Sequence, residues 1–313
     1  MKENPDILFL LGCTACGKGE VAHLLARELP AEVISLDSMK VYRGLDIGTA
    51  KPSLGRQKEV RYHLLDIVEP GDPFSTGDYL HRAAAVLAEI YARGTQAFFV
   101  GGTALYYKRL TEGLVTTPRI PAGIRGELRT EGEARGSPAL HDELARVDPA
   151  AAANIHPNDL QRTTRALEVF HATGVKFSEF LARTAPPLVR PGSFVSVCLR
   201  RDRDDLYERI NRRVDGMLDR GLVEEVKTLL GRPGGLSRTA TQALGYKEVI
   251  DLVHGDCGEI ETRERIKQKT RNFAKRQMTW FRSFRELRWI DVARDEPAIT
   301  AATKCLAELR RNP

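Results

Sequence analysis

The spacing of apolar and polar residues predicts a parallel sheet flanked by helices. A continuous apolar run at residues 7–11 ends at Gly12, and apolar residues then recur at helical spacing over residues 20–29, which predicts a strand, a tight loop and a helix. Two more strand-like runs lie at residues 32–36 and 97–100, with a helical stretch at 79–91 before the second. Because strands that alternate with helices form parallel sheets, we expect an α/β core.

The strand pattern stops near residue 118 and does not return until about residue 190. Helical patterns replace it at residues 139–146 and 161–170, and prolines punctuate both ends of the interval. We therefore predict a helical domain of residues 119–190, inserted into the α/β core.

The last third of the chain is expected to return to the core and then to become helical. A strand-like run lies at residues 194–199. Helical patterns follow at residues 204–218, 223–230 and 261–287, with a turn at Gly245. The remainder is predicted to be helical, so the core comprises residues 1–118 and 191–313.

The composition is that of a globular protein with a basic balance. The 313 residues are 42% hydrophobic and 29% charged, with a net charge of +6. This balance favours a polyanionic partner, although it is also common in proteins that bind none. Five scattered cysteines argue for the reducing cytosol, and the apolar run at residues 7–11 is too short to span a membrane. We expect a cytoplasmic protein with no membrane partner.

A phosphate-binding loop follows the first predicted strand. Its sequence is Gly12-Cys13-Thr14-Ala15-Cys16-Gly17-Lys18, which matches G-x-x-x-x-G-K between a strand and a helix. Loop amides, the helix N-terminus and the Lys18 ammonium converge on phosphate oxygens in such loops. We expect Gly12 to Gly19 to bind a diphosphate or nucleotide in a P-loop NTPase-like fold. The alternative is a glycine turn that only caps a strand, and Cys13 with Cys16 also permits a redox interpretation.

Position 19 departs from the loop's usual chemistry. The Ser or Thr that normally follows the lysine is Gly19, so the hydroxyl that would hold Mg²⁺ is missing. Phosphate binding does not require that hydroxyl. Mg²⁺ stays the expected cofactor, but the sequence identifies no ligand for it.

A carboxylate follows the second predicted strand. Asp37 opens a conspicuous stretch that continues to Pro52. The carboxyl ends of parallel strands face the crevice in which such sheets bind ligands, so Asp37 is a candidate general base. The alternative is a turn or helix cap made by the Asp37-Ser38 pair.

Residues 37–52 closely resemble the signature of tRNA dimethylallyltransferases, also called tRNA isopentenyltransferases. The resemblance continues in order over nearly the whole chain. Its further blocks are His63 to Ile67, Pro73 to Ser75, Val100 to Tyr106, His156 to Asp159, Arg165 to Val169, Gln242 to Lys247 and Lys275 to Arg282.

The resemblance implies an activity and its residues. In the family, a flipped adenine and a prenyl diphosphate enter opposite ends of one channel. Asp37 would accept the proton from the adenine amine, Thr103 would lie near the reacting centre, and the diphosphate would rest on the phosphate loop, Lys18 and Arg212. Matching segments imply tRNA contacts at Thr103, Asp37, Ser38, Met39, Lys40, Arg125, Gln161, Arg162, Thr163, Thr164, Arg165, Gln242, Ala243, Leu244, Gly245, Tyr246, Lys247, Lys275, Arg276, Gln277, Met278, Thr279, Trp280, Phe281 and Arg282.

Some positions depart from the family pattern. Lys40 stands where Gln is usual and Ala104 where Gly is usual, while Cys13 and Cys16 replace Pro and Ser. Lys40 and Ala104 could change the fit of the anticodon loop. His63 and Thr103 also have structural interpretations, as a buried histidine and a helix cap.

The segment from Glu261 to Trp289 is strongly basic, with ten Lys or Arg residues against three acidic ones. Ile266, Phe273, Trp280, Phe281 and Phe284 recur at helical spacing there, so we expect one face to pack and the other to bind nucleic-acid phosphates. The alternative is a solvated helix face.

The resulting prediction is a monomeric enzyme that transfers a dimethylallyl group from dimethylallyl diphosphate to N6 of adenosine 37, beside the anticodon in a tRNA anticodon stem-loop. Two alternatives stay open. A small-molecule or nucleotide kinase would share the phosphate loop but not need the basic helix, and a non-catalytic RNA-binding protein would tolerate Gly19.

Overall fold

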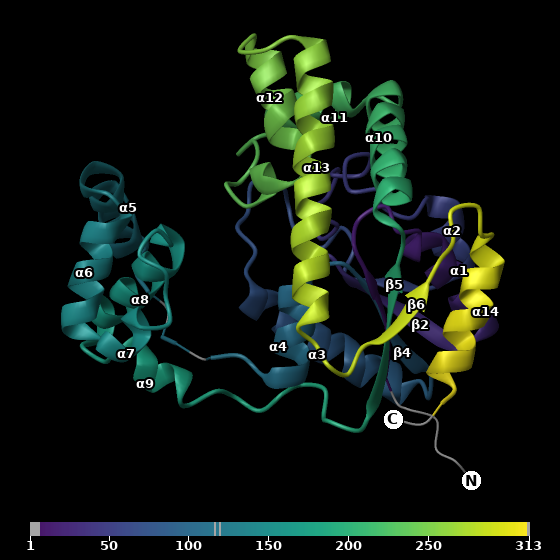
Figure 1. The fold of residues 1–313 in the computed structure, drawn as a ribbon, viewed down its shortest axis with the longest axis horizontal. Coiled ribbons are helices and arrows are strands. Elements are labelled where there is room, and N and C mark those ends of the chain that lie inside the picture. The colour runs from purple at the N-terminus through teal and green to yellow at the C-terminus, as the bar shows by residue number, and fades with distance from the viewer. Residues whose placement is uncertain (1–6, 116, 119, 312–313) are drawn as a thin grey trace. The chain divides into compact units, whose positions relative to one another are not determined.

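A computed structural model describes residues 7–311 except 116 and 119. One sheet of six parallel strands organises the larger part of the chain (Figure 1). The strand order is β3-β2-β4-β1-β5-β6. The strands are β1 (Ile7–Gly12), β2 (Ala31–Leu36), β3 (Tyr62–His63), β4 (Gln96–Gly101), β5 (Phe194–Arg200) and β6 (Arg288–Asp291). The predicted α/β class is confirmed.

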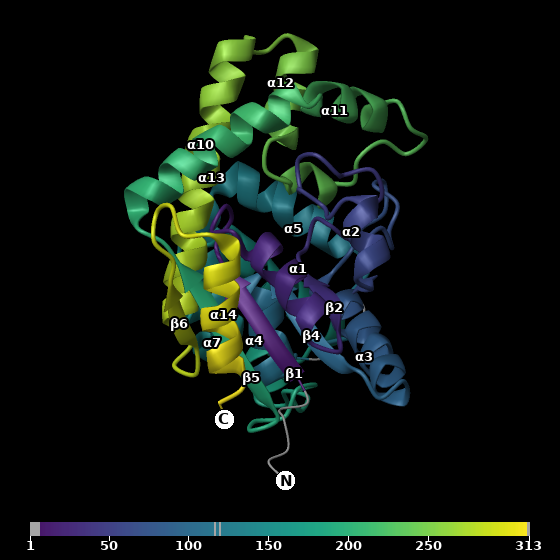
Figure 2. The same cartoon turned by 90° about the vertical axis from the view of Figure 1, so that its right-hand side faces the viewer.

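Helices cover both faces of this sheet. Helices α1 (Lys18–Glu28) and α14 (Ala298–Leu309) lie side by side on one face (Figure 2). Helices α3 (Thr76–Ala92) and α4 (Ala104–Glu112) lie on the other (Figure 1). A short helix, α2 (Leu54–Glu59), precedes β3. Because both faces are covered, the central strands can be continuous apolar runs, and every residue of β1 is buried.

A set of aromatic rings packs the central strands against the α4 side. The Phe9 ring in β1 stacks on Phe99 in β4 at 4.9 Å and meets Tyr107 of α4 edge-on at 5.1 Å. Tyr107 in turn contacts Phe284 edge-on, and its hydroxyl donates to Ser196. Edge-to-face and stacked pairs add to the stabilisation that apolar burial provides.

Four helices pack together beyond one end of the sheet: α10 (Arg203–Asp219), α11 (Leu222–Leu230), α12 (Tyr246–His254) and α13 (Glu259–Arg282) (Figure 2). Helix α13 contacts both α10 and α12, and it also contacts β1. No helix among residues 7–311, with the gaps noted, is long and apolar enough to cross a bilayer.

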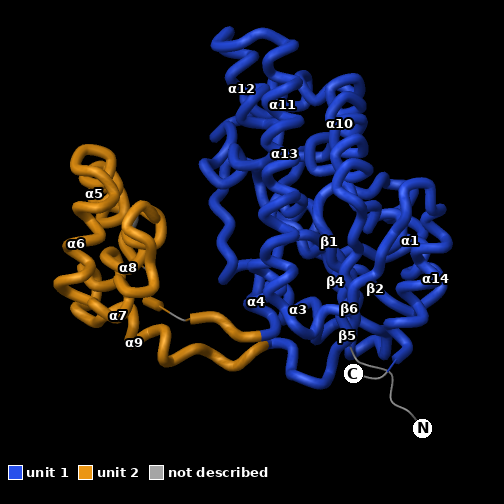
Figure 3. The backbone as a smooth tube through the Cα atoms, in the orientation of Figure 1, with its two compact units in different colours: residues 1–111, 188–313 blue, residues 112–187 orange. Residues whose placement is uncertain are grey.

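A second compact unit comprises residues 112–187 (Figure 3). Its helices are α5 (Ala122–Arg135), α6 (Ser137–Val147), α7 (Pro149–Ala152), α8 (Leu160–Thr173) and α9 (Phe177–Leu181). A separate core that includes Leu140, Leu144 and Leu167 holds them together. The predicted boundaries of the insertion, at residues 119 and 190, differ by a few residues from these limits.

The chain crosses between the units twice, and the two crossings are hydrogen-bonded to each other. Val189 N donates to Leu110 O at 2.9 Å on the side of the first unit. Ala185 N donates to Leu114 O at 3.0 Å on the side of the second. The two connections therefore run as a pair.

Several predicted elements need correction. The basic helix ends at Arg282 and not at residue 287, and β6 follows where only helix was expected. The strand β3 and the helix α12, which begins directly after the Gly245 turn, were not predicted. Helix α3 begins at Thr76 and not near residue 79, because Ser75 and Asp78 form a capping box.

His63 lies in an edge strand of the sheet within a small polar cluster, where it is half-buried and not fully buried as expected. Its Nε2 is 2.7 Å from Glu32 Oε2, and Glu32 also accepts hydrogen bonds from Arg93 and Thr95. The hydrogen bond from Arg93 lowers the pKa of Glu32 to about 2. Glu32 is therefore ionised at neutral pH and links β2 to the end of α3.

Candidate active site

A cavity of about 820 Å³ opens at the carboxyl ends of β1, β2 and β4. The phosphate loop, the turn after β2 and the turn after β4 line it, together with α10, α13 and the segment before α12. This edge is where parallel sheets of this type bind ligands. The predicted phosphate loop, Asp37, Thr103 and Arg212 all contribute to the wall of this one cavity.

The phosphate loop is held in place through its carbonyl groups. Arg201 Nε donates to Cys16 O at 2.9 Å, and Arg209 Nε donates to Ala15 O at 3.0 Å. Lys18 Nζ donates to Cys13 O at 3.0 Å. These bonds fix the loop, and the first amides of α1 are available to an anion because they have no carbonyl acceptor within the helix.

Cations dominate the cavity wall. Besides Lys18, they are Lys40, Arg56, Arg209, Arg212, Arg213 and Arg276. Two acidic residues share the wall, and one of them, Glu20, is paired with Arg56. A cavity with this balance attracts a polyanion.

Asp37 caps a turn, as one interpretation of its sequence position predicted, and its side chain also lies in the cavity wall. Its Oδ1 accepts hydrogen bonds from Met39 N at 2.9 Å and Lys40 N at 3.3 Å, which is a turn cap. Its Oδ2 accepts none from the described residues, and the side chain lines the cavity. One carboxylate oxygen thus fixes the turn while the other is available to a ligand.

The turn after β4 is pressed against the end of β2. A Cβ on Gly101 would lie 2.0 Å from Leu36 O, so only glycine fits there. The amides of Gly102 and Thr103 both donate to Leu36 O at 3.2 Å. This approach brings Thr103 Oγ1 within 3.1 Å of Ser38 N, from which it accepts a hydrogen bond. Thr103 therefore braces the Asp37 turn, and its hydroxyl proton is free for another acceptor.

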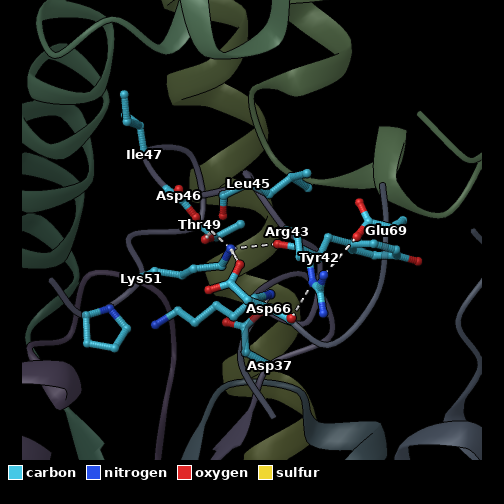
Figure 4. A network of polar contacts seen from close by, with 12 residues as sticks. Asp37, Tyr42, Arg43, Leu45, Asp46, Ile47, Thr49, Lys51, Asp66 and Glu69 are labelled. Atoms are coloured by element: carbon cyan, nitrogen blue, oxygen red, sulfur yellow. Dashed lines mark hydrogen bonds and ion pairs between the residues drawn. The ribbon is translucent and has the colours of Figure 1, made fainter. Parts of the chain in front are cut away.

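A buried lysine secures the loop that follows Asp37. Lys51 Nζ donates to Tyr42 O, Asp46 Oδ1 and Asp66 Oδ1 at 2.5–2.6 Å, and the side chain is 4% exposed (Figure 4). Glu225 holds the same loop from α11 by accepting from Ile47 N at 2.7 Å. Residues 37–51 thus form an ordered wall of the cavity.

Lys40, the residue that departs from the family pattern, lines the same cavity as Asp37. Burial of its ammonium lowers the pKa of Lys40 to about 8, while Asp37 acts in the opposite direction and Lys18 adds to the lowering. Lys40 therefore loses its charge around pH 8.

The basic helix divides into two parts. In its N-terminal half, Arg263 pairs with Asp215 of α10, and Arg265 and Lys269 pair with Asp251 and Glu248 of α12. In and after its C-terminal half, Lys275, Arg276, Arg282 and Arg285 are exposed and make no ion pair with the described residues. Only this second group is a free cationic surface, so the predicted phosphate-binding face is shorter than the charge excess suggested.

The apolar face of α13 also differs from the prediction. Ile266, Phe281 and Phe284 are buried as expected, but Trp280 is 37% exposed and Phe273 lines the cavity. Gln277, which was grouped with the RNA contacts, is 7% exposed.

The other expected RNA contacts occupy varied environments. Gln242, Ala243 and Leu244 line the cavity, whereas Tyr246 is buried and donates to Glu225. In the second unit, Arg125 and Arg165 pair with the buried Glu168, and Arg162 pairs with Asp159. Thr163 and Thr164 are buried, Gln161 and Lys247 are exposed, and Thr279 beside Met278 is exposed.

Three residues of the predicted phosphate loop do not reach the cavity wall. Gly12, Cys13 and Cys16 are absent from it, and both cysteines are buried free thiols. A hydrogen bond between the two side chains lowers the pKa of Cys16 and raises that of Cys13.

Sequence reasoning missed Arg209 and Arg213. With Arg212 they occupy positions i, i+3 and i+4 of α10, a spacing that places all three on one helix face. The sequence therefore contained a signal for this cationic helix face in the spacing of the three arginines.

Comparisons with known proteins agree with this geometry. The sequence model of a family described as IPP transferase matches residues 40–284. A tRNA dimethylallyltransferase from Geobacter sulfurreducens is 45% identical over 287 residues, which is 91% of each chain. The chain belongs to the IPP transferase family. A second relative, tRNA dimethylallyltransferase 1 from Pelobacter propionicus, is 42% identical over 97% of each chain.

A solved structure of the IPP transferase family has the same fold. The tRNA isopentenylpyrophosphate transferase of Bacillus halodurans superposes with a TM-score of 0.68 at 37% identity, over 97% of each chain. The span matched by the family model includes Thr103, Arg212 and the C-terminal half of α13 but begins after Asp37. Membership in this family favours a prenyltransferase over the kinase alternative.

The pKa of Lys40 leads to a prediction about anion binding. Affinity for inorganic diphosphate should fall as the pH rises from about 7 to about 9, because the Lys40 ammonium loses its proton in that interval. Calorimetry should show that the affinity of Lys40→Gln for diphosphate decreases by a factor about threefold to tenfold smaller over the same pH interval. At each pH, the ratio of the two proteins' affinities for diphosphate cancels the effect of protonation of diphosphate itself. A constant ratio across this range would contradict the prediction.

Proposed function

We propose that this protein is a tRNA dimethylallyltransferase that moves the dimethylallyl group from dimethylallyl diphosphate to N6 of adenosine 37. The observation that carries the proposal is that a phosphate loop, seven cations and a half-free carboxylate line one cavity. In the reaction, the bond between C1 of the prenyl group and the diphosphate oxygen breaks. A bond between C1 and the adenine nitrogen forms, and that nitrogen loses one proton.

The cationic end of the cavity suits the leaving group. The negative charge on the diphosphate grows as its bond to carbon breaks, so donors fixed in advance at that end lower the barrier. We assign this role to the amides of Ala15, Gly17 and Gly19, to Lys18, and to Arg212 with its neighbours Arg209 and Arg213. The hydrogen bonds from Arg201 and Arg209 to loop carbonyls support the assignment, since they hold the loop in advance of binding.

The carboxylate end suits the nucleophile. An exocyclic adenine amine is a poor nucleophile, and a carboxylate that accepts its proton strengthens it while the new bond forms. We assign this role to Asp37 Oδ2. Thr103 is placed by its bond to Ser38 to orient the same amine through its hydroxyl.

We further propose that the exposed cations at and beyond the C-terminal half of α13 hold the tRNA anticodon stem-loop, together with residues of the helical insertion. The net charge of +6 and the four exposed cations from Lys275 to Arg285 support a phosphate-backbone contact. The proposal includes action as a monomer in the cytoplasm. The five free cysteines are consistent with that reducing compartment.

Mg²⁺ fits this site only as an ion carried by the diphosphate. Among the described residues, no group of three or more His, Cys, Asp or Glu side chains could hold a metal. Gly19 offers no hydroxyl, so diphosphate oxygens and water would supply most ligands. When bound, the ion would neutralise charge on the leaving group.

The direct test incubates the protein with tRNA and labelled dimethylallyl diphosphate and locates the label by nuclease digestion. Label on the adenosine beside the anticodon supports the proposal. RNA binding without transfer would favour the non-catalytic alternative.

Asp37→Asn should lower the single-turnover transfer rate by about 10²–10⁴-fold while tRNA affinity is retained. The asparagine oxygen can still accept from Met39 N and Lys40 N, so the turn should persist. Glu69→Gln, which removes an exposed carboxylate paired with Arg43, is the control. A near-normal rate in Asp37→Asn would remove Asp37 from the mechanism.

The salt dependence of tRNA binding should report the free cations of α13. Replacing Lys275 and Arg282 by Gln should make the slope of log affinity against log salt shallower by about 1–2. Arg276 is left intact because it also lines the cavity. The matched control replaces Arg263 and Arg265, which are paired with Asp215 and Asp251, and should leave the slope unchanged. Equal slopes in both double variants would place the RNA contact elsewhere.

Gly19→Thr should lower the Mg²⁺ concentration needed for half-maximal transfer. A Cβ at position 19 meets nothing within 4 Å, so the side chain fits, and its hydroxyl can add one bond to the ion or a phosphate oxygen. One such bond corresponds to roughly 10-fold or more in affinity. The control is Gly19→Val, because valine has nearly the same shape as threonine but no hydroxyl. It separates the effect of the hydroxyl from the effect of added side-chain volume. The same Mg²⁺ dependence in the Thr and Val variants would show that the hydroxyl has no role.

A further inference from the structure

A buried glutamine of α13 joins two loops of the active site. Gln277 Oε1 accepts a hydrogen bond from Thr14 N in the phosphate loop at 2.8 Å, and its Nε2 donates to Gly102 O at 2.7 Å. The two partners lie 263 and 175 residues away in the sequence. One amide group therefore bridges the ends of β1 and β4 from a third element.

The fit around this amide is close. A Cβ on Gly102 would lie 2.5 Å from Gln277 Nε2 and 3.2 Å from Gly12 O. Glycine at position 102 is thus needed for the glutamine to reach both loops. The position of the amide is thus fixed by two hydrogen bonds and by close packing against Gly102, where a side chain would not fit.

The bridge continues to the carboxylate. Thr103, the next residue after Gly102, accepts from Ser38 N, and Asp37 directly precedes Ser38. Gln277 is therefore connected through Gly102, Thr103 and Ser38 to the proposed base, and through Thr14 to the phosphate loop. The diphosphate end and the amine end of the cavity meet at this side chain.

We propose that Gln277 is a positioning residue that sets the phosphate loop and the Thr103 turn relative to each other, and so aligns the leaving group with the amine. The inference rests on the proposed transfer reaction. It also replaces the expectation that Gln277 contacts tRNA, because the side chain is only 7% exposed and its amide already bonds to two loops inside the protein. The neighbouring Lys275 and Arg276 are exposed, so α13 carries exposed cations beside this internal brace.

The expected size of the effect follows from the geometry. A buried N–H or C=O left without its partner is destabilised, and a displacement of about 1 Å at a reacting centre can cost about 10²-fold in rate. Gln277→Met keeps the length and removes both bonds. We expect its single-turnover rate at saturating substrates to fall about 10–100-fold.

The decisive comparison measures that rate together with the affinities for tRNA and inorganic diphosphate. In Gln277→Met, tRNA affinity should stay within about twofold, and diphosphate affinity should fall a few-fold because the loop loses a support. Gln268→Met is the matched control, since Gln268 is an exposed glutamine of the same helix. A normal rate with weakened tRNA binding would make Gln277 an RNA contact and overturn the proposal, as would normal values throughout.

A double-mutant cycle keeps the proposal testable if Gln277→Met folds poorly. Gly102→Ala should slow transfer by displacing the glutamine, whereas in a Gln277→Ala background it should add less, because the closest contact of the new methyl group, with Gln277 Nε2, is then removed. Additive effects would overturn the proposal.

If the unaltered protein and Gln268→Met transfer no prenyl group, the proposed reaction fails. Unchanged diphosphate affinity in Gln277→Met would then overturn the positioning role separately.

Discussion

The active site depends on the parallel register of three strands. Leu11 of β1 pairs with Gly101 of β4, and Gly101 pairs with Leu36 of β2, so the three strands end at the same level. Each loop to which we assign chemistry starts there: the phosphate loop after β1, the Asp37 turn after β2 and the Thr103 turn after β4. A slip of one residue in either pairing would turn every side chain of the strand to the opposite face and separate the phosphate loop from the carboxylate.

The sequence predicted these elements because their signals are local. The apolar run at residues 7–11, the glycine-lysine loop and the carboxylate after the second strand are each complete within a few residues. The strand β6 was missed because it contributes four residues at the edge of the sheet, with charged residues at both ends. The extent of α13 was overestimated because Phe284 and Leu287 are buried beyond the helix end and continue its apolar spacing.

Side-chain roles on α13 could not be read from residue type. Ten basic residues in one segment suggest a nucleic-acid surface, yet Arg263, Arg265, Lys267 and Lys269 are opposed by acids of α10 and α12. Those acids lie up to about fifty residues away in sequence, so local charge counting does not register them. The internal hydrogen bonds of Gln277 could not be foreseen for the same reason, since both of its partners are distant along the chain.

The paired crossings between the units also bear on how the chain folds. A loop of this length has an entropic cost of closure that grows only slowly with its number of residues, as (3/2)RT ln n. The bonds between Leu110 and Val189 and between Leu114 and Ala185 bring the two ends of the loop together. Because its two ends lie next to each other, the helical unit can be inserted into the α/β core in the same way as a short surface turn. The sequence between the crossings can therefore vary in length and composition without changing the topology of the sheet.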